Sequence, residues 1–169
     1  RRPIQGSTHK KIRDHLISIY RDLITKKIVA ISVNGIPLKY DKPEVLNKKL
    51  AGALRDRFPD FPREEVKWET PIDIDLSSGM NVKGFAALRA IGYSKGTGFT
   101  LFRQGRAISG LEESPWQPEK IFKHGNSFER QRIFGDLHLS GVGGKVAFSK
   151  NAFLWDLGVE EELIEKLSA

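Results

Sequence analysis

The pair Asn34-Gly35 constrains this chain more than any other short segment. It lies between two apolar runs, Ile28–Val33 and Ile36–Tyr40. Both residues tolerate the positive φ angles that a two-residue type I′ turn requires, so the segment predicts a β-hairpin. A second hairpin is predicted around Gln104-Gly105, which separates two further short apolar runs.

An amphipathic helix is expected before the first hairpin. Ser7 or Thr8 can cap its start, and the pattern continues to about Lys26. Its apolar residues recur at i, i+4, i+7 and i+11, which places them on one stripe; they are Ile12, Leu16, Ile19 and Leu23. The charged residues are assigned to the other faces: Lys10, Lys11, Arg13, Asp14, Arg21 and Asp22.

The remaining elements indicate an α+β fold. Further strands are expected at Val66–Leu76, Val82–Ile91, Phe134–Leu139 and Val146–Phe148, and helices at Val45–Arg57, Phe128–Ile133 and Val159–Leu167. Because strands come as antiparallel neighbours with helices inserted between them, the sequence predicts a two-layer, mostly antiparallel sheet packed with helices. No internal repeat or long linker divides residues 1–169, which predicts a single domain.

Composition excludes several classes of protein. There is no cysteine, so disulfides, thiolate zinc sites and cysteine nucleophiles are excluded. No run of 18 apolar residues could span a membrane, and no apolar stretch near the start resembles a signal peptide. We therefore expect a cytoplasmic protein without a membrane partner. Because the first residue is Arg1 rather than Met, we expect the chain to be a domain excised from a larger protein.

The positive charge is concentrated in the first third of the chain. The whole chain carries 28 Lys and Arg against 21 Asp and Glu, a net charge of +7, and most of the excess lies in residues 1–60. A basic region of this kind can meet phosphates or an acidic partner, or can be a solvated helix face. The residues that could contact nucleic acid are Lys10, Lys11 and Arg13 on the first helix, and Arg103 and Arg106 beside Phe99 and Phe102 at the second hairpin.

No motif for catalysis or metal binding can be assembled. Gly141–Lys145 resembles a P-loop, but Leu139 stands where its first glycine is needed, and Val146 stands in place of the Ser or Thr. The four histidines share no metal-ligand spacing. Asp73 and Asp75 point the same way on one strand and could hold a cation, although a solvated strand face explains them more simply. We therefore expect no metal site.

Two parts of the chain resemble a known family. GFTLFRQGRAISG, QPEKIFKHGNSFERQRIFGDLHLSG and VAFSKNAFLW lie within Gly98–Trp155, and HLISIYRDLITKKIVAISVNGIPL spans His15–Leu38. Their order and spacing resemble the region after the nucleotide-binding domain in large bacterial ATPases of the gyrase, Hsp90, histidine-kinase and MutL superfamily, with MORC-like members closest. In that superfamily this region is the transducer, a ribosomal protein S5 domain 2-like layer.

The resemblance implies a role for one lysine. A transducer lysine reaches the γ-phosphate of ATP in the preceding domain, and Lys150 in Phe-Ser-Lys-Asn matches it. Lys145 is the fallback, because the glycine-rich loop can shift the alignment. The superfamily's own ATP and magnesium residues have no counterpart here, since Asp156-Leu157-Gly158 follows the lysine, where no adenine pocket would lie. We expect this chain to bind no cofactor alone, with ATP and magnesium held in the missing domain.

The sequence therefore predicts a non-catalytic transducer that relays nucleotide state. Its partner is the nucleotide-binding domain of the same parent chain, to which the helix at residues 1–26 would connect. Whether the parent dimerises or acts on DNA stays open. The alternatives are a stand-alone basic nucleic-acid-binding module, which predicts binding that weakens steeply with salt, and a small enzyme, against which the absence of a catalytic set argues.

Overall fold

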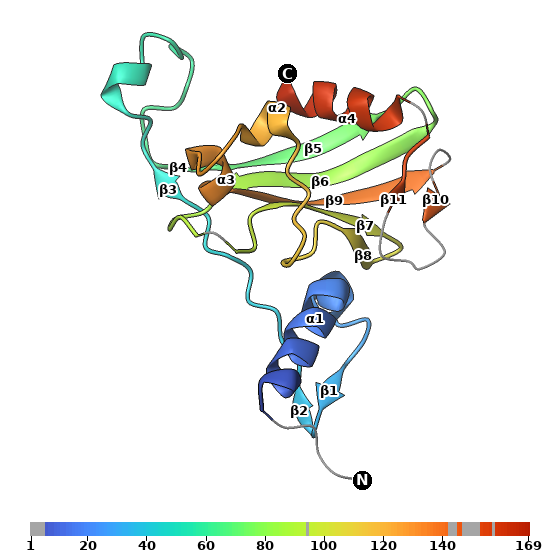
Figure 1. Cartoon of the computed structure of the whole chain (residues 1–169). Helices are drawn as coiled ribbons and strands as arrows, with labels where there is room; N and C mark the ends of the chain where they lie inside the picture. The colour runs from blue at the N-terminus through green and yellow to red at the C-terminus, as the bar shows by residue number, and fades with distance from the viewer. Residues whose placement is uncertain (1–5, 94, 142–144, 147–152, 157) are drawn as a thin grey trace.

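The computed structural model describes residues 6–93, 95–141, 145–146, 153–156 and 158–169. A five-stranded sheet forms its centre, with helices on both faces (Figure 1). The elements are α1 (Gly6–Thr25), β1 (Ser32–Val33), β2 (Ile36–Pro37), β3 (Asn47–Lys48), the 3₁₀ helix η1 (Gly52–Leu54), β4 (Val66–Lys67), β5 (Glu69–Asp75), β6 (Met80–Leu88), β7 (Gly98–Arg103), β8 (Arg106–Ser109), α2 (Glu119–Phe122), α3 (Phe128–Arg132), β9 (Ile133–Gly141), β10 (Lys145–Val146), β11 (Phe153–Leu154) and α4 (Val159–Ser168).

The sheet is mixed. Its strand order is β5-β6-β9-β7-β8, and every neighbouring pair is antiparallel except β7 and β9, which run parallel. The α+β class and the mostly antiparallel sheet are confirmed. The parallel pair was not predicted, because it joins strands that are separated by a hairpin and two short helices.

One face of the sheet carries the main apolar core. Alternate residues of the strands, including Phe99, Leu101 and Leu137, pack there against Phe122 of α2 and Leu163 of α4. These side chains are at most 3% exposed, and burying each one contributes about 1.5–3 kcal/mol. The predicted C-terminal helix is therefore confirmed, and its apolar stripe closes the core.

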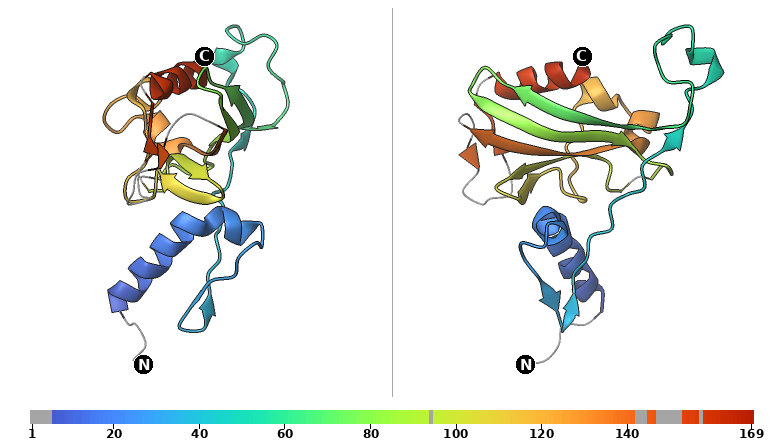
Figure 2. Two further views of the ribbon diagram at one scale, coloured as in Figure 1. Left: turned by 90° about the vertical axis from the view of Figure 1, so that its right-hand side faces the viewer. Right: turned by 180° about the vertical axis from the view of Figure 1, so that it is seen from behind.

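The N-terminal segment covers the β7–β8 end of the opposite face. Below the sheet lie α1 and the small pair β1–β2, and the chain then crosses to the sheet through residues 38–46 (Figure 2). Asn34 and Gly35 have φ angles of 52° and 78°, so the predicted two-residue turn is confirmed. Its strands are shorter than the apolar runs suggested. With α1 on this face, the arrangement exceeds the two layers that were expected.

The predicted helix at Val45–Arg57 is wrong. Val45 forms a bridge with Arg89, and the backbone N–H of Leu46 donates to the carbonyl of Leu88 at 2.7 Å. The segment extends the edge of the sheet, because strand pairing with β6 satisfies backbone groups that a short isolated helix would leave exposed. It then continues through β3 and η1 before returning as β4.

The other local predictions are largely confirmed. Gln104 and Gly105, with φ angles of 51° and 76°, close the β7–β8 hairpin. Ser127 caps α3 by accepting a hydrogen bond from the N–H of Arg130 at 3.1 Å. Val66–Leu76, expected as one strand, is interrupted at Trp68 into β4 and β5. Among the described residues, no helix has the length and apolar character needed to cross a membrane.

Candidate coupling site between the first helix and the sheet

The structure does not describe the side chains of the two lysines that the resemblance implicates in γ-phosphate contact. Lys150 lies outside the described residues, and Lys145 is described only as a backbone position of β10. Strand β10 pairs with β11 through Lys145 with Leu154 and Val146 with Phe153.

The basic residues proposed for nucleic-acid contact fall into two environments. Lys10 and Lys11 are exposed on α1, and Arg13 is half-buried. Arg103 and Arg106, at the β7–β8 hairpin, are also half-buried, because α1 packs over this hairpin. A Cβ atom added at Gly105 would lie 2.4 Å from Cδ2 of Leu23, which shows how closely the helix approaches the turn. The hairpin is therefore an internal contact surface.

An ion pair fixes α1 to the middle of the sheet. The Arg21 guanidinium donates to the carboxylate of Asp136 on β9, and the two side chains are only 14% and 20% exposed. The guanidinium also lies 5.1 Å from the Tyr40 ring centroid and 5.2 Å from that of Phe102. Cation–π contacts of this kind add about 0.5–2 kcal/mol each. Arg21 thus joins α1, the crossing segment and two strands.

The assignment of Arg21 and Asp22 to the outer faces of α1 was wrong. Both are turned toward the sheet, where Asp136 and His138 of β9 offer partners. A signal was available in the sequence, because Asp14, Ser18 and Arg21 occur at i, i+4 and i+7 and form a polar stripe beside the apolar one. Tyr40 and Asp136 carried no comparable local signal.

His138 forms a second contact in this junction. Its ring stacks on Phe102 at 4.9 Å between centroids, and its Nε2 lies 3.7 Å from Oδ1 of Asp22. Burial lowers the pKa of His138; Asp22 and Asp136 act in the opposite direction, whereas Lys26 and Arg21 reinforce the lowering. The folded protein therefore favours the neutral imidazole.

This lowered pKa predicts a loss of stability in mild acid. Below the ordinary histidine pKa of about 6.5, His138 is protonated in the unfolded chain but still neutral in the folded protein. The free energy of unfolding therefore decreases as the pH is lowered, until the pH falls below the folded-state pKa of His138. In His138→Gln this contribution should disappear. Urea unfolding of both proteins between pH 7 and pH 5 checks this, and parallel pH profiles would contradict it.

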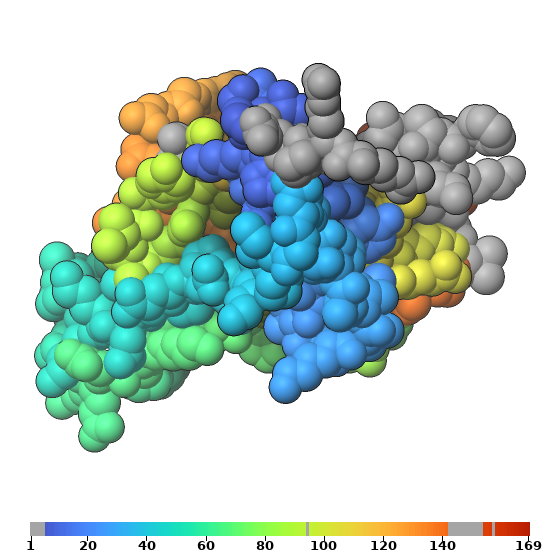
Figure 3. All heavy atoms as spheres, turned by 90° about the horizontal axis from the view of Figure 1, so that it is seen from below, coloured from blue at the N-terminus to red at the C-terminus, as the bar shows by residue number. Residues whose placement is uncertain are grey.

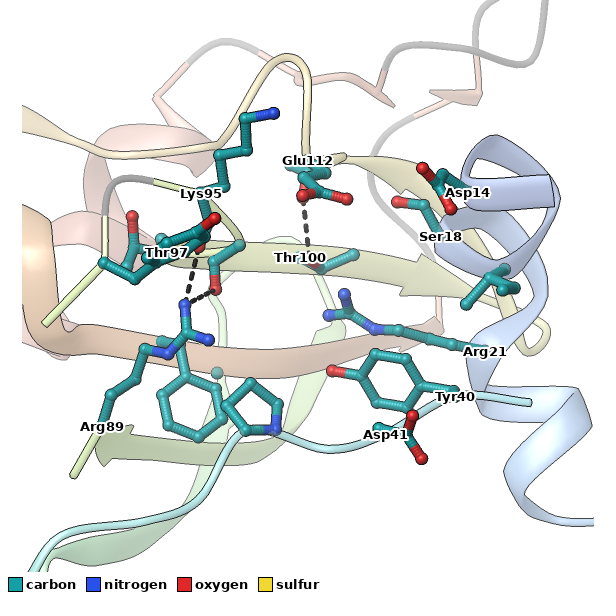
Figure 4. A pocket seen from close by; sticks show the side chains of 18 residues that line it. Asp14, Ser18, Arg21, Tyr40, Asp41, Arg89, Lys95, Thr97, Thr100 and Glu112 are labelled. Carbon is teal, nitrogen blue, oxygen red and sulfur yellow. Dashed lines mark hydrogen bonds between the residues drawn. The ribbon is translucent and has the colours of Figure 1, made fainter. Parts of the chain in front are cut away.

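A cavity of about 300 Å³ lies in the same junction, between α1, the crossing segment and the strands β7 and β9 (Figures 3 and 4). Its inner wall includes Ser18, Thr97 and Thr100, which are all at most 9% exposed. The Thr100 hydroxyl donates to the carbonyl of Gly110 at 2.7 Å. Charged side chains surround these polar groups, so the lining of this cavity is polar, whereas the core on the other face of the sheet is apolar.

Tyr40 projects toward this cavity (Figure 4). Burial raises the pKa of its hydroxyl, Arg21 and Arg89 counteract the rise, and Asp136 and Glu112 add to it. The hydroxyl therefore keeps its proton at neutral pH and is available as a hydrogen-bond donor.

Buried polar atoms without hydrogen-bond partners gather at this junction. Six such side-chain atoms occur within the described ranges, and five belong to α1 or to the hairpin beneath it. These five are His9 Nε2, Ser18 Oγ, Arg21 Nε, Arg103 Nη1 and Arg106 Nε. An unsatisfied buried group costs about 1–3 kcal/mol. These costs offset part of what the contacts between α1 and the sheet contribute.

Metal binding finds no support in the part of the chain that can be described. It contains no group of three or more histidine or acidic side chains arranged to hold a metal ion. Asp73 and Asp75 do lie together on the exposed side of β5, where each accepts a hydrogen bond from Nδ2 of Asn81, at 3.0 and 2.8 Å. The two carboxylates are thus bridged by an amide.

Comparisons with protein-family models, with curated proteins and with solved structures find no match for this chain. The functional argument therefore rests on the junction around α1 and on the sequence resemblance.

Proposed function

We propose that this chain is a non-catalytic transducer of a larger ATPase, with a ribosomal protein S5 domain 2-like layer as its frame. The observation that carries the proposal is the contrast between the two faces of the sheet. One face is closed by an apolar core, whereas α1 is held not only by its apolar stripe, with Ile19 buried, but also by an ion pair, aromatic contacts and polar groups around a cavity. An element held in this way can change position without disrupting the core.

The polar junction suits a relay of nucleotide state. Apolar cores lose stability with small displacements, because close-packed side chains leave no room to move. Charged and hydroxyl groups beside a cavity can exchange partners, and two atoms of the lining, Ser18 Oγ and Arg21 Nε, have no hydrogen-bond partner within the described residues. Because α1 precedes the sheet in the chain, a neighbouring N-terminal domain would act on the sheet through this helix.

Lys150 would make the arrangement of the two domains depend on which nucleotide is bound. A lysine from one domain forms charge-assisted hydrogen bonds with a γ-phosphate in another only while that phosphate is present. Its contribution therefore differs between the ATP-bound and ADP-bound states, which is what a ligand must do to shift an equilibrium. Lys150 would be supplied by this chain, and ATP and magnesium would be held in the neighbouring domain.

The test is ATP hydrolysis by a longer protein that contains this chain and its nucleotide-binding domain. Lys150→Ala should lower turnover about a hundredfold, the typical effect of losing one charge-stabilising donor. Lys83→Ala is the matched control, because Lys83 pairs with Asp73 on the exposed side of the sheet. Unchanged turnover in Lys150→Ala, or hydrolysis by the present chain alone, would contradict the proposal; loss in Lys145→Ala alone would transfer the role to Lys145.

Nucleic-acid binding is the second candidate, and the exposure of Lys10 and Lys11 favours it. Neither lysine makes an ion pair within the described segments. Both could therefore contact phosphates, and binding would then weaken steeply as salt increases. Arg103 and Arg106 were also predicted to contact nucleic acid, but they are half-buried beneath α1, which argues against that part of the prediction.

A further inference from the structure

Six charged side chains from the described residues line the cavity beside α1 (Figure 4). Arg21 lies on the same side as Asp14 and is already paired with Asp136, and the other five are separated by sign. Arg89 and Lys95 lie on one side, in the connection from β6 to β7. Asp14 of α1 and Asp41 of the crossing segment lie on the other side, and Glu112, which follows β8, lies between them. The cavity is thus polarised from the sheet toward the N-terminal segment.

These five charges are not paired with one another. Within the described ranges, none of them lies within ion-pair distance of an opposite charge. The Arg89 guanidinium donates to the carbonyls of Lys95 and Gly96, at 2.6 and 3.5 Å. These bonds hold the loop in place and leave the positive charge uncompensated by any carboxylate.

The charge pattern favours a ligand that carries both signs of charge. An anion beside Arg89 would be repelled by the three carboxylates, and a cation beside Asp14 would be repelled by Arg89 and Lys95. A molecule with separated negative and positive groups can satisfy both sides at once. The cavity is therefore complementary to a zwitterion.

Size and lining define the ligand further. About 300 Å³ is at the lower limit of small-molecule sites, so the cavity has room for a molecule the size of an amino acid. Ile17, Pro43 and Phe134 add an apolar portion to the wall. The Tyr40 hydroxyl has no hydrogen-bond partner among the described residues and projects into the space, where it can donate to a carboxylate.

We propose that this cavity binds a small aliphatic amino acid, with its carboxylate toward Arg89, Lys95 and Tyr40 and its ammonium group toward Asp14, Asp41 and Glu112. The ligand would bridge α1 and the sheet. This inference does not depend on the transducer role, because it concerns binding by the present chain alone.

The experiment titrates the 169-residue chain with L-valine and follows backbone amide chemical shifts. Matched probes are N-acetyl-L-valine, which lacks the ammonium charge, and L-valinamide, which lacks the carboxylate. L-valine should shift amides of residues 14–21, 95–100 and 110–112 saturably, and each blocked probe should bind at least about tenfold more weakly. Absence of saturable shifts with L-valine, or equal binding of a blocked probe, would overturn the proposal.

Two surface variants assign the ends of the ligand. Asp14→Asn and Lys95→Met change exposed side chains, so the fold should be retained. Each should weaken L-valine binding several-fold, whereas Lys83→Met, outside the cavity, should not. If both cavity variants bind L-valine as the wild type does, the proposed orientation is wrong even though binding occurs.

Discussion

Replacing Arg21 with methionine is expected to release α1 from the sheet while the sheet remains folded. The substitution leaves Asp136, which is 20% exposed, without its cation, and removes both cation–π contacts. Breaking a buried ion pair costs about 3–5 kcal/mol and an exposed pair about 1 or less, so a loss of about 2–3 kcal/mol is expected for this partly exposed pair. Amide hydrogen exchange resolves the effect by segment.

The exchange pattern separates a local from a global effect. Amides of α1 should lose protection in Arg21→Met, whereas those of β6 and β9 should keep it. Arg21→Lys keeps the charge but not the planar fork, so it should give an intermediate loss. Equal loss of protection in α1 and β9 would show that the helix is part of one cooperative unit with the core.

Replacing Phe102 with alanine is expected to destabilise the whole sheet. The ring is fully buried on β7, stacks with His138 and lies beneath the Arg21 guanidinium. Truncating a buried phenylalanine costs about 3–5 kcal/mol, because transfer energy is lost and a cavity remains. Urea denaturation should show this as a lower midpoint with an unchanged slope.

The control for Phe102 is a phenylalanine in a different environment. Phe58 is 47% exposed, in the excursion between β3 and β4, and Phe58→Ala should cost about 1 kcal/mol or less. Equal destabilisation by the two substitutions would mean that the junction does not depend on Phe102. A loss in Phe102→Ala below about 1 kcal/mol would contradict the described packing.

The elements with strong local signals were predicted from the sequence. The apolar stripe of α1 and the turn residues Asn34-Gly35 and Gln104-Gly105 each determine a conformation through neighbouring residues alone. The helix expected at Val45–Arg57 failed because pairing with β6 decides the conformation of its first residues. The parallel pairing of β7 with β9 likewise depends on residues distant in sequence.

The candidate site was less accessible from the sequence. Arg21 was visible as part of a polar stripe, but its partner Asp136 lies 115 residues later. Phe99 and Phe102 belong to the same predicted hairpin, yet Phe99 packs in the apolar core and Phe102 contacts Arg21 of α1 on the other face. Local patterns could not reveal that α1 covers this second face.

We propose α1 as the route by which nucleotide state reaches the sheet. Its direct test is amide hydrogen exchange in a longer protein that contains the nucleotide-binding domain, with and without a non-hydrolysable ATP analogue. The analogue should change the protection of α1 and of residues 38–46, leave β6 and β9 unchanged, and have no effect in Lys150→Ala. Uniform protection changes across the chain, or none in α1, would contradict the account.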